Sequence, residues 1–325
     1  MRDRPVLVTG ATGFVGSHLA DRLLAEGARV RVLVRDPRNL IEPLRDRVEI
    51  VTGDLQHPDC FGPATKDIDT VFHVAAWLGK PNRSAAAYAI NVTATRQLAE
   101  AARSNHVRRF VYTSSIAVYG PVLSGVIDET QPHWPVYDYG ATKSLGEQAA
   151  FAVQDDRFEV TVLRPAMVYG ARGASWTTLP VKLARRGLPS LISGGRGLAH
   201  PVYVENLIDA YLLAAERPEA VGEAFTISDS DLPWRDFFGR YAAMAGKRAR
   251  SLPVPMVLIA SAMAELAAKI SGRPAAISRV QLGFVTGRAQ LSTAKAQRLL
   301  GWSPRIPFDE AMRRTEAWLR AEKYL

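Results

Sequence analysis

The sequence predicts an α/β fold: a doubly wound parallel sheet with helices on both faces, joined to a smaller and mostly helical domain. Between residues 6 and 163, short apolar and β-branched runs alternate with segments of helical periodicity. That alternation is typical of a parallel sheet. A glycine-rich turn follows the first run, and beyond residue 165 the chain becomes rich in Gly, Arg and Pro before a mostly helical C-terminal part.

The elements follow one another in a regular order. Residues 6–9 form an apolar run closed by glycine, 16–26 have helical spacing, and 29–34 are β-branched again. These three segments predict a strand, a helix and a strand. We expect further strands at 48–51, 70–74, 110–114 and 160–163, and a long alanine-rich helix over 85–104. Strands separated by helices imply parallel pairing.

Each domain is predicted to consist of two separate segments. A helix over 202–216 and a strand at 224–228 return to the sheet, whereas the loops around a short helix at 178–186 do not continue the alternation. We assign the dinucleotide-binding domain and the substrate-binding domain accordingly, the first to 1–166 with 202–228 and the second to 167–201 with 229–325. We find no repeat of fixed period.

Composition narrows the class of protein. The single cysteine, Cys60, allows no intrachain disulfide and no cysteine metal cluster, which fits a reducing cytoplasm. The N-terminus lacks the pattern of a secretion signal, so we predict a cytoplasmic protein. Because there is only one cysteine, we also predict no metal site. The net charge of +9 favours anionic ligands. Because the basic residues are scattered, we expect an anionic cofactor and no nucleic acid.

The segment TGATGFVG spaces Gly10, Gly13 and Gly16 at the first strand-to-helix junction. There, glycines permit a tight turn, close approach of a pyrophosphate and close packing of the helix on the strand. The helix N-terminus adds free amide donors for phosphate. We therefore predict a Rossmann-type dinucleotide site with contacts from Gly10, Thr12, Gly13, Phe14, Val15 and Gly16.

The end of the second strand bears on the choice of cofactor. An acidic residue there would bind the ribose hydroxyls of NAD, but the chain reads Val34-Arg35-Asp36. Directly after the strand, the guanidinium of Arg35 is suited to a 2′-phosphate, with Arg38 assisting, and this favours NADP over NAD. The alternative is that Arg35 is a surface charge and Asp36 binds the ribose.

Later strand ends supply further candidates. Asp54 follows the third strand, where its carboxylate can accept a hydrogen bond from adenine while Leu55 packs on the ring; an ordinary turn is the alternative. The fourth strand ends in His73 and the small residues Ala75 and Ala76, as expected where backbone passes close to a cofactor. For His73 itself, packing within the strand is an equally good interpretation.

The reactive groups are predicted near residues 114–143. Ser114 and Ser115 lie at the C-terminal end of a buried strand, the edge where open α/β sheets bind ligands. In YGATK, Tyr139 and Lys143 are four residues apart and share a helix face. A phenol titrates near pH 10, so we expect the Lys143 cation to lower its pKa. Taken alone, each of these features is common in helices and turns.

In combination, the motifs resemble the short-chain dehydrogenase/reductase superfamily. The resemblance is to its extended, epimerase-like branch, nearest the 3β-hydroxysteroid dehydrogenase-like and ketone reductase members. The motifs are TGATGFVG, GDL at 53–55, HVAA at 73–76, SSIAVYG at 114–120, YGATK, LRPAMVYG at 163–170, YVENLIDA at 203–210 and LGWSPRIPFDEAM at 300–312.

The resemblance implies a role for each reactive residue. Ser115 would polarise a substrate carbonyl, Tyr139 would be the general acid-base, and Lys143 would lower the pKa of Tyr139 and bind the nicotinamide ribose. It also implies that Asn91 shapes the active site. Residues 165–168, with Pro165 and Val168 as contacts, would lie beside the nicotinamide.

The class of substrate is predicted from one departure from the pattern of this branch, at Met167, and from one predicted helix, at 252–270. Sugar-nucleotide enzymes of this branch usually carry an asparagine where this chain has Met167, and methionine cannot replace an amide donor. We therefore expect an apolar alcohol or ketone bound by Ser115, Met167 and His200. The alternatives are a nucleotide-sugar epimerase or dehydratase, and a cofactor-binding protein without turnover that acts as a sensor or scaffold. Arg172 and Arg196 could meet an anionic group or be solvated.

The segment 252–270 has the length of a membrane span but contains Glu265 and Lys269. A stripe recurs along it at helical spacing: Met256, Ile259, Met263, Leu266 and Ile270. We interpret it as an amphipathic helix that packs on the core or walls the substrate pocket, with peripheral membrane contact as the alternative. The resemblance also implies a homodimer through the helices at 85–104 and 139–151.

Overall fold

The computed structural model describes residues 1–78, 84–271 and 279–325. Its centre is a seven-stranded sheet in the order β12-β7-β5-β4-β1-β2-β3, and every neighbouring pair is parallel. The strands are β1 (Pro5–Thr9), β2 (Arg29–Val34), β3 (Glu49–Thr52), β4 (Thr70–His73), β5 (Arg109–Thr113), β7 (Glu159–Pro165) and β12 (Ala224–Ile227). The chain winds outward from β1 in both directions, which confirms the predicted Rossmann-type doubly wound sheet.

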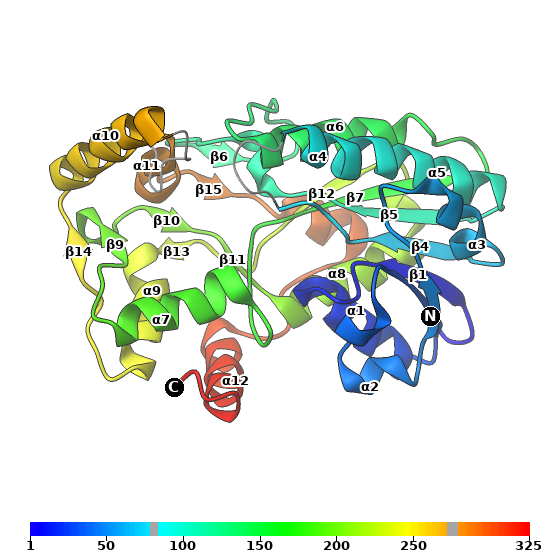
Figure 1. Ribbon diagram of the computed structural model, residues 1–325, viewed down its shortest axis with the longest axis horizontal. Coiled ribbons are helices and arrows are strands. Elements are labelled where there is room, and N and C mark those ends of the chain that lie inside the picture. The colour runs from blue at the N-terminus through cyan, green and yellow to red at the C-terminus, as the bar shows by residue number, and fades with distance from the viewer. Residues whose placement is uncertain (79–83, 272–278) are drawn as a thin grey trace.

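Helices cover both faces of this sheet (Figure 1). One face is covered by α3 (Phe61–Thr65), α4 (Ser84–Tyr88), α5 (Ala94–Ser104) and α6 (Asp138–Phe151), and the other by α1 (Phe14–Ala25) and α8 (Val204–Glu216). The short helix α2 (Glu42–Arg45) follows β2. The predicted helix over 85–104 is present as α4 and α5, joined by a π-helical turn at Ala89–Thr93.

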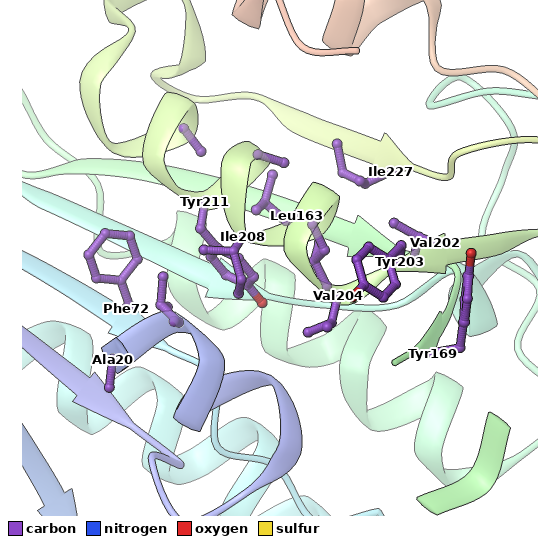
Figure 2. Packing of buried hydrophobic residues seen from close by; sticks show 14 of the residues in the cluster. Ala20, Phe72, Leu163, Tyr169, Val202, Tyr203, Val204, Ile208, Tyr211 and Ile227 are labelled. Atoms are coloured by element: carbon purple, nitrogen blue, oxygen red, sulfur yellow. The ribbon is translucent and has the colours of Figure 1, made fainter. Parts of the chain in front are cut away.

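Two hydrophobic clusters pack against the large sheet, one on each face. Along β1, Val6 and Val8 belong to one cluster and Leu7 to the other, because successive strand side chains point to opposite faces. Figure 2 shows the first cluster, in which Ile208 and Tyr211 of α8 lie against the sheet beside Phe72. Both faces of the strands are therefore buried, which explains their continuous apolar runs.

The remaining helices and short strands lie beyond the sheet on one side of the molecule (Figure 1). The helices are α7 (Leu179–Arg185), α9 (Trp234–Met244), α10 (Val254–Ser271), α11 (Arg279–Thr286) and α12 (Phe308–Ala321). Four two-stranded pairs accompany them, between β8 (Met167–Tyr169) and β11 (Pro201–Tyr203), β9 (Leu191–Ile192) and β14 (Ser251–Leu252), β10 (Leu198–Ala199) and β13 (Leu232–Pro233), and β6 (Val126–Ile127) and β15 (Gln290–Leu291). All seven strands of the large sheet lie within the two segments that we assign to the dinucleotide-binding domain.

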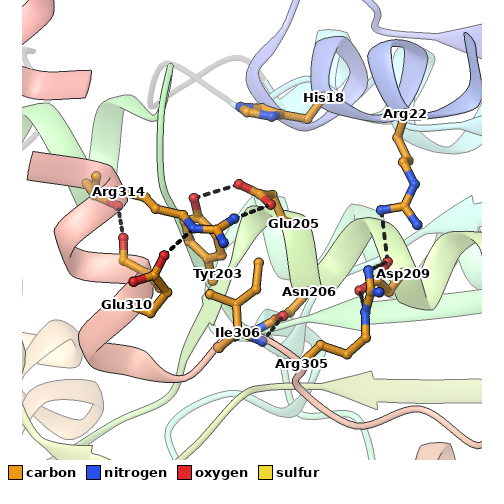
Figure 3. A network of polar contacts seen from close by, with 12 residues as sticks. His18, Arg22, Tyr203, Glu205, Asn206, Asp209, Arg305, Ile306, Glu310 and Arg314 are labelled. Carbon is orange, nitrogen blue, oxygen red and sulfur yellow. Dashed lines mark hydrogen bonds and ion pairs between the residues drawn. The ribbon is translucent and has the colours of Figure 1, made fainter. Parts of the chain in front are cut away.

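The segment after residue 300 returns to α8. Figure 3 shows Arg305 and Arg22 both directed at Asp209, and Ile306 bonded to the side chain of Asn206. The indole of Trp302 donates to the Asn206 carbonyl oxygen at 2.9 Å. Two of the segments that carried the resemblance, 203–210 and 300–312, therefore contact each other and tie α12 to the sheet.

The helix predicted over 252–270 is present as α10, but its apolar stripe is oriented differently from our preferred interpretation. Met256, Ile259 and Met263 are 56%, 62% and 67% exposed. The buried positions are Val257 and Ser261, on the opposite side of the helix. The interpretation that the stripe packs on the core is therefore wrong for these three residues. The side chains of Leu266 and Ile270 lie outside the described residues.

Candidate active site

The candidate residues converge because parallel strands end at the same edge of the sheet. β1, β4, β5 and β7 are adjacent and in register, so the segments that follow them meet. Gly10 comes directly after β1, Ala75 follows β4, and Ser115 follows β5. Pro165 is the last residue of β7. The structure thus brings the glycine turn and the reactive serine to one edge.

The glycine turn has a geometry that other residues would not permit. Gly10 has φ +76°, and a Cβ on it would lie 2.8 Å from the Ala75 nitrogen. A Cβ on Gly16 would lie 2.2 Å from the Gly10 oxygen. Gly13 is the N-cap of α1, and Thr12 and Gly13 are exposed. The turn therefore presents the amide end of α1 to solvent, which suits the pyrophosphate of a dinucleotide.

The two residues predicted as alternatives for binding the adenosine ribose or its phosphate, Arg35 and Asp36, follow β2 and differ in their environment. β2 ends at Val34, so Arg35 is the first residue past the strand, and it is exposed. The Asp36 carboxylate accepts hydrogen bonds from the Arg38 guanidinium at 2.8 to 3.1 Å. These bonds lower the pKa of Asp36. The acid that would bind ribose hydroxyls is thus already paired, whereas no ion pair involves Arg35 within the described residues.

The segments after β3 and β4 form the next part of the edge. The Asp54 carboxylate accepts a hydrogen bond from the Gln56 amide at 3.0 Å, and half-buried Leu55 packs against the second core cluster. Ala75 and Ala76 are half-buried, and the Ala75 amide donates to the Thr9 hydroxyl at 3.1 Å. Asp54 therefore serves a turn in this structure, and its contact with adenine stays a prediction.

His73 is fully buried and bonded on both sides of its ring. Its Nδ1 lies 2.8 Å from the Thr9 hydroxyl and its Nε2 lies 3.0 Å from the Thr95 hydroxyl. Burial, with a smaller contribution from Lys143, lowers the pKa of His73 to about 3. A neutral ring with both nitrogens engaged is suited to packing between the strand and α5, not to proton transfer.

Ser115 and Tyr139 come from two elements that approach closely. Ser115 is the N-cap of a 3-10 turn, η4 (Ile116–Tyr119), and its hydroxyl accepts from the Ala117 amide at 3.1 Å. A Cβ on Gly140 would lie 2.4 Å from the Ala117 oxygen. The missing side chain at Gly140 therefore lets the start of α6 rest on the serine turn. Burial raises the pKa of Tyr139 to about 12, and the nearby Ser115 side chain opposes the rise.

Lys143 lies one turn after Tyr139 and is buried, with 1% of its surface exposed. Its Nζ donates to the Thr113 carbonyl oxygen at 2.5 Å and to the Tyr112 hydroxyl at 3.4 Å. Burial lowers the pKa of Lys143 to about 7, against a smaller opposing effect of Glu147. We expected Lys143 to lower the pKa of Tyr139, and here burial outweighs any such effect because both groups lose hydration.

Asn91 holds this helix to the segment after β4. Its side-chain oxygen accepts from the Trp77 amide at 2.7 Å, and its Nδ2 donates to the Trp77 carbonyl oxygen at 3.0 Å. The same Nδ2 donates to the Thr142 hydroxyl at 3.0 Å. A Cβ on Gly146 would lie 2.5 Å from the backbone carbonyl oxygen of Asn91. Asn91 therefore links α6 to Trp77 in the segment after β4.

Sequence reasoning missed a buried ion pair beside this site. The Glu147 carboxylate accepts hydrogen bonds from Arg164 at 2.6 and 2.9 Å, and the Ser114 hydroxyl also donates to it. The third Arg164 nitrogen donates to the Tyr119 hydroxyl at 2.9 Å. Two signals could have revealed the pair: Glu147 follows Lys143 at the same four-residue spacing, and Arg164 interrupts an apolar strand.

Two of the residues predicted to contact the substrate, Met167 and His200, are buried or paired with another side chain. Met167 is buried in the main core cluster, whereas Val168 is half-buried. His200 pairs with Asp231 at 2.6 Å. The Arg172 guanidinium donates to Asp21 at 2.8 Å through one nitrogen, whereas its Nη1 is buried without a partner among the described residues, and Arg196 is exposed. The substrate contacts of Met167 and His200 stay predictions.

A model of the NAD dependent epimerase/dehydratase family matches residues 6–228, which include the glycine turn, the serine turn and the Tyr-Lys helix. The chain belongs to this family. The predicted resemblance to the extended branch of the short-chain dehydrogenases/reductases is thereby confirmed, as is the expectation of an enzyme that acts on a hydroxyl group with a nicotinamide cofactor.

Curated relatives of this family member include both kinds of enzyme that we weighed. The chain is 28% identical to sterol-4-alpha-carboxylate 3-dehydrogenase (decarboxylating) of Mus musculus, with 95% of this chain and 89% of the relative covered. It is 29% identical to UDP-glucose 4-epimerase of Vibrio cholerae, over 98% and 96%. It is 29% identical to 3-beta-hydroxysteroid dehydrogenase of Mycolicibacterium neoaurum, over 94% and 89%.

Two negative findings apply to the described ranges. Among the helices there, none is both long and apolar enough to cross a membrane. Within the same ranges, no cluster of three or more His, Cys, Asp or Glu side chains could hold a metal ion.

Proposed function

We propose that this family member is an NADP(H)-dependent oxidoreductase that interconverts a secondary alcohol and a ketone on an apolar substrate, such as a steroid-like, acyl or aromatic compound. The observation that carries the proposal is the contact between the Ser115 turn and α6, which places the Ser115 and Tyr139 hydroxyls together and the Lys143 amine one helical turn away. That arrangement supplies a hydrogen-bond donor, a transferable proton and a cation.

The residues at the sheet edge fit a nicotinamide dinucleotide. Gly10 and Gly16 leave room that a Cβ would fill, and the amide end of α1 is exposed. The contacts that we propose are Gly10, Thr12, Gly13, Phe14, Val15, Gly16, Arg35, Asp54, Leu55, Ala75, Ala76, Tyr139, Lys143, Pro165 and Val168. When bound, the cofactor supplies or accepts the hydride. The exposed Arg35 beside a paired Asp36 supports NADP over NAD.

Ser115, Tyr139 and Lys143 then perform the proton chemistry. In ketone reduction, Ser115 donates a hydrogen bond to the carbonyl oxygen and Tyr139 transfers its proton to that oxygen; alcohol oxidation reverses both steps. A pKa of about 12 keeps the phenol protonated at neutral pH, as a proton donor requires. Lys143 lies on α6 one turn after Tyr139 and is bonded to the Thr113 carbonyl oxygen, and we propose that its charge stabilises the phenolate left behind.

An apolar substrate is supported by the segment after β7. Met167 offers no hydrogen-bond donor to a diphosphate. Two of the relatives named above are a sterol and a steroid dehydrogenase. The alternative function, a nucleotide-sugar epimerase or dehydratase with tightly bound NAD(P), is supported by the UDP-glucose 4-epimerase relative.

Net consumption of the cofactor distinguishes the two functions. Purified enzyme is mixed with NADPH and, separately, with 3-oxosteroids, simple aromatic ketones and 3-oxoacyl esters, and nicotinamide absorbance is followed. We expect stoichiometric NADPH consumption with at least one apolar ketone and none with UDP-glucose or UDP-galactose. Interconversion of these two sugars without net change in absorbance would contradict the oxidoreductase and support the epimerase.

Two further expectations belong to the proposal. We propose a homodimer through α4, α5 and α6, on whose outer surfaces Tyr88 and Leu145 are exposed, and a cytoplasmic location. Light scattering on the purified chain tests the first, because a mass of one chain would exclude the dimer. Fractionation of the producing cells tests the second.

A further inference from the structure

The outer surface of α10 is apolar without a partner in the described structure. Met256, Ile259 and Met263 are between 56% and 67% exposed, and we call these three residues the apolar ridge. The inner surface of the same helix is already packed through Val257 and Ser261. Exposed apolar side chains that gather on one helix face mark an interaction surface more often than scattered single ones do.

Basic side chains lie on the segments next to β14, the strand that precedes this helix. β14 leads into α10 and pairs with β9, and the Leu191 amide donates to the Arg250 carbonyl oxygen at 3.1 Å. This pairing brings the segments 185–190 and 245–252 together. They contain no Asp or Glu. Five exposed side chains from these segments form what we call the basic cluster: Arg185, Arg186, Lys247, Arg248 and Arg250.

We infer that the apolar ridge and the basic cluster together dock this protein on the surface of an anionic lipid bilayer. Apolar side chains of a helix lying in the interface enter the acyl boundary, while neighbouring Lys and Arg side chains attract anionic headgroups. Figure 1 shows α10 and β14 together at the end of the molecule opposite α3 and α5. The glycine turn and α1 therefore stay clear of the bilayer.

Charge decides between a bilayer and a second copy of the chain. In a symmetric contact through the apolar ridge, both copies bring the same basic cluster to the complex. Like charges oppose that contact, and the whole chain already carries +9. An anionic bilayer has the opposite sign and needs no complementary groove. This inference does not rest on the proposed reaction.

The experiment is vesicle flotation with the full-length chain, without cofactor or substrate. Phosphatidylcholine vesicles are compared with vesicles that also contain phosphatidylglycerol, at low and high salt. We expect binding to the anionic vesicles that weakens as salt rises. The variants Met256→Ser/Ile259→Ser/Met263→Ser and Lys247→Ser/Arg248→Ser should each bind about tenfold or more weakly.

Matched variants separate the local surface from general properties of the chain. Leu78→Ser removes an apolar side chain that is 76% exposed elsewhere. Arg47→Ser/Lys66→Ser removes two exposed charges from the sheet domain, and so lowers the net charge equally. Both should bind as the wild type does. Thermal melting verifies that every variant is folded, and folded variants are expected because each substitution is at an exposed position.

Three results would overturn the inference. The first is the absence of flotation with anionic vesicles at low salt. The second is an equal loss of binding in the matched variants, which would assign the effect to net charge. The third is a fall in molecular mass of the apolar ridge variant without vesicles, measured by light scattering, which would make the ridge an interface between two copies.

Discussion

The Glu147 carboxylate on α6 and the Arg164 guanidinium on β7 form two hydrogen bonds, of 2.6 and 2.9 Å, in a position where both side chains are less than a tenth exposed. Ser114, the residue before the proposed catalytic serine, donates to the same carboxylate. The pair therefore joins the end of β5, the end of β7 and the helix that carries Tyr139 and Lys143.

Glu147→Gln should destabilise the protein by about 3 kcal/mol, because it leaves the Arg164 charge buried without its counterion. Urea unfolding followed by circular dichroism measures this change. The control is Glu100→Gln, which breaks the pair between Arg96 and Glu100, both largely exposed, and should change stability by less than about 0.5 kcal/mol. Equal effects in the two variants would show that the buried pair contributes no more to stability than the exposed pair does.

Gly140→Ala should separate the serine turn from α6. The added Cβ would lie 2.4 Å from the Ala117 oxygen, so the backbone must shift at a cost of about 2 kcal/mol. We expect lower stability together with reduced turnover. Gly239→Ala in α9 is the matched control, because a Cβ there meets nothing within 4 Å, and it should stabilise by about 0.5 kcal/mol or more. Wild-type stability in Gly140→Ala would contradict the close contact.

Tyr139→Phe should lower turnover by about 100-fold or more, because it removes the transferable proton. NADPH affinity should change little, since the ring remains. Steady-state rates with an accepted ketone and fluorescence titration with NADPH measure the two quantities. Turnover near that of the wild type would exclude Tyr139 as the proton donor. A parallel loss of NADPH affinity would indicate that the variant disturbs the cofactor site.

Arg35→Ser should weaken NADPH binding by about tenfold or more and leave NADH binding nearly unchanged, because only the 2′-phosphate loses a charged partner. Calorimetric titration with each cofactor gives both affinities. Arg47→Ser, which removes an exposed arginine away from the strand end, serves as the control for net charge. If the ratio of the two affinities is the same in Arg35→Ser and the wild type, Arg35 is only a surface charge.

Lys143 should make stability depend on pH in an unusual direction. Its pKa is about 7 in the folded chain and 10.5 ordinarily. Between these values the unfolded chain binds a proton that the folded chain releases, so stability rises with pH through this window. Lys143→Met removes the buried amine. Its stability relative to the wild type should therefore be highest below pH 7 and should fall as pH approaches 10.5.

Thermal melting of both proteins from about pH 6 to pH 10 tests this expectation. Lys66→Met, which replaces an exposed lysine, corrects for changes in the rest of the chain. A melting-temperature difference between Lys143→Met and the wild type that is constant over this range would show that Lys143 is no harder to charge when folded than when unfolded.

Much of the architecture could be predicted from local pattern. The order of strands and helices followed from apolar periodicity, and the turn at Gly10 to Gly16 followed from glycine spacing, because both signals are local consequences of backbone geometry. The same holds for the arrival of Ser115 at the sheet edge. The four-residue spacing of Tyr139 and Lys143 likewise predicted that they share one face of α6.

The tertiary structure decided what depends on the surroundings of a side chain. The spacing of the apolar stripe correctly predicts a helix at α10. Periodicity does not say, however, which face of that helix the rest of the protein covers. Here Val257 is buried and Ile259 is exposed. His73 offered two interpretations until its burial between Thr9 and Thr95 was known.

The charge states at the site were likewise beyond local pattern. Sequence spacing placed a cation next to Tyr139, yet the pKa values of Tyr139 and Lys143 depend on how much water each group loses on folding. The partners Glu147 and Arg164 are 17 residues apart and lie on different elements. The sequence by itself determined the fold and the order of the reactive residues, whereas burial, which arises only from long-range packing, decided their environment.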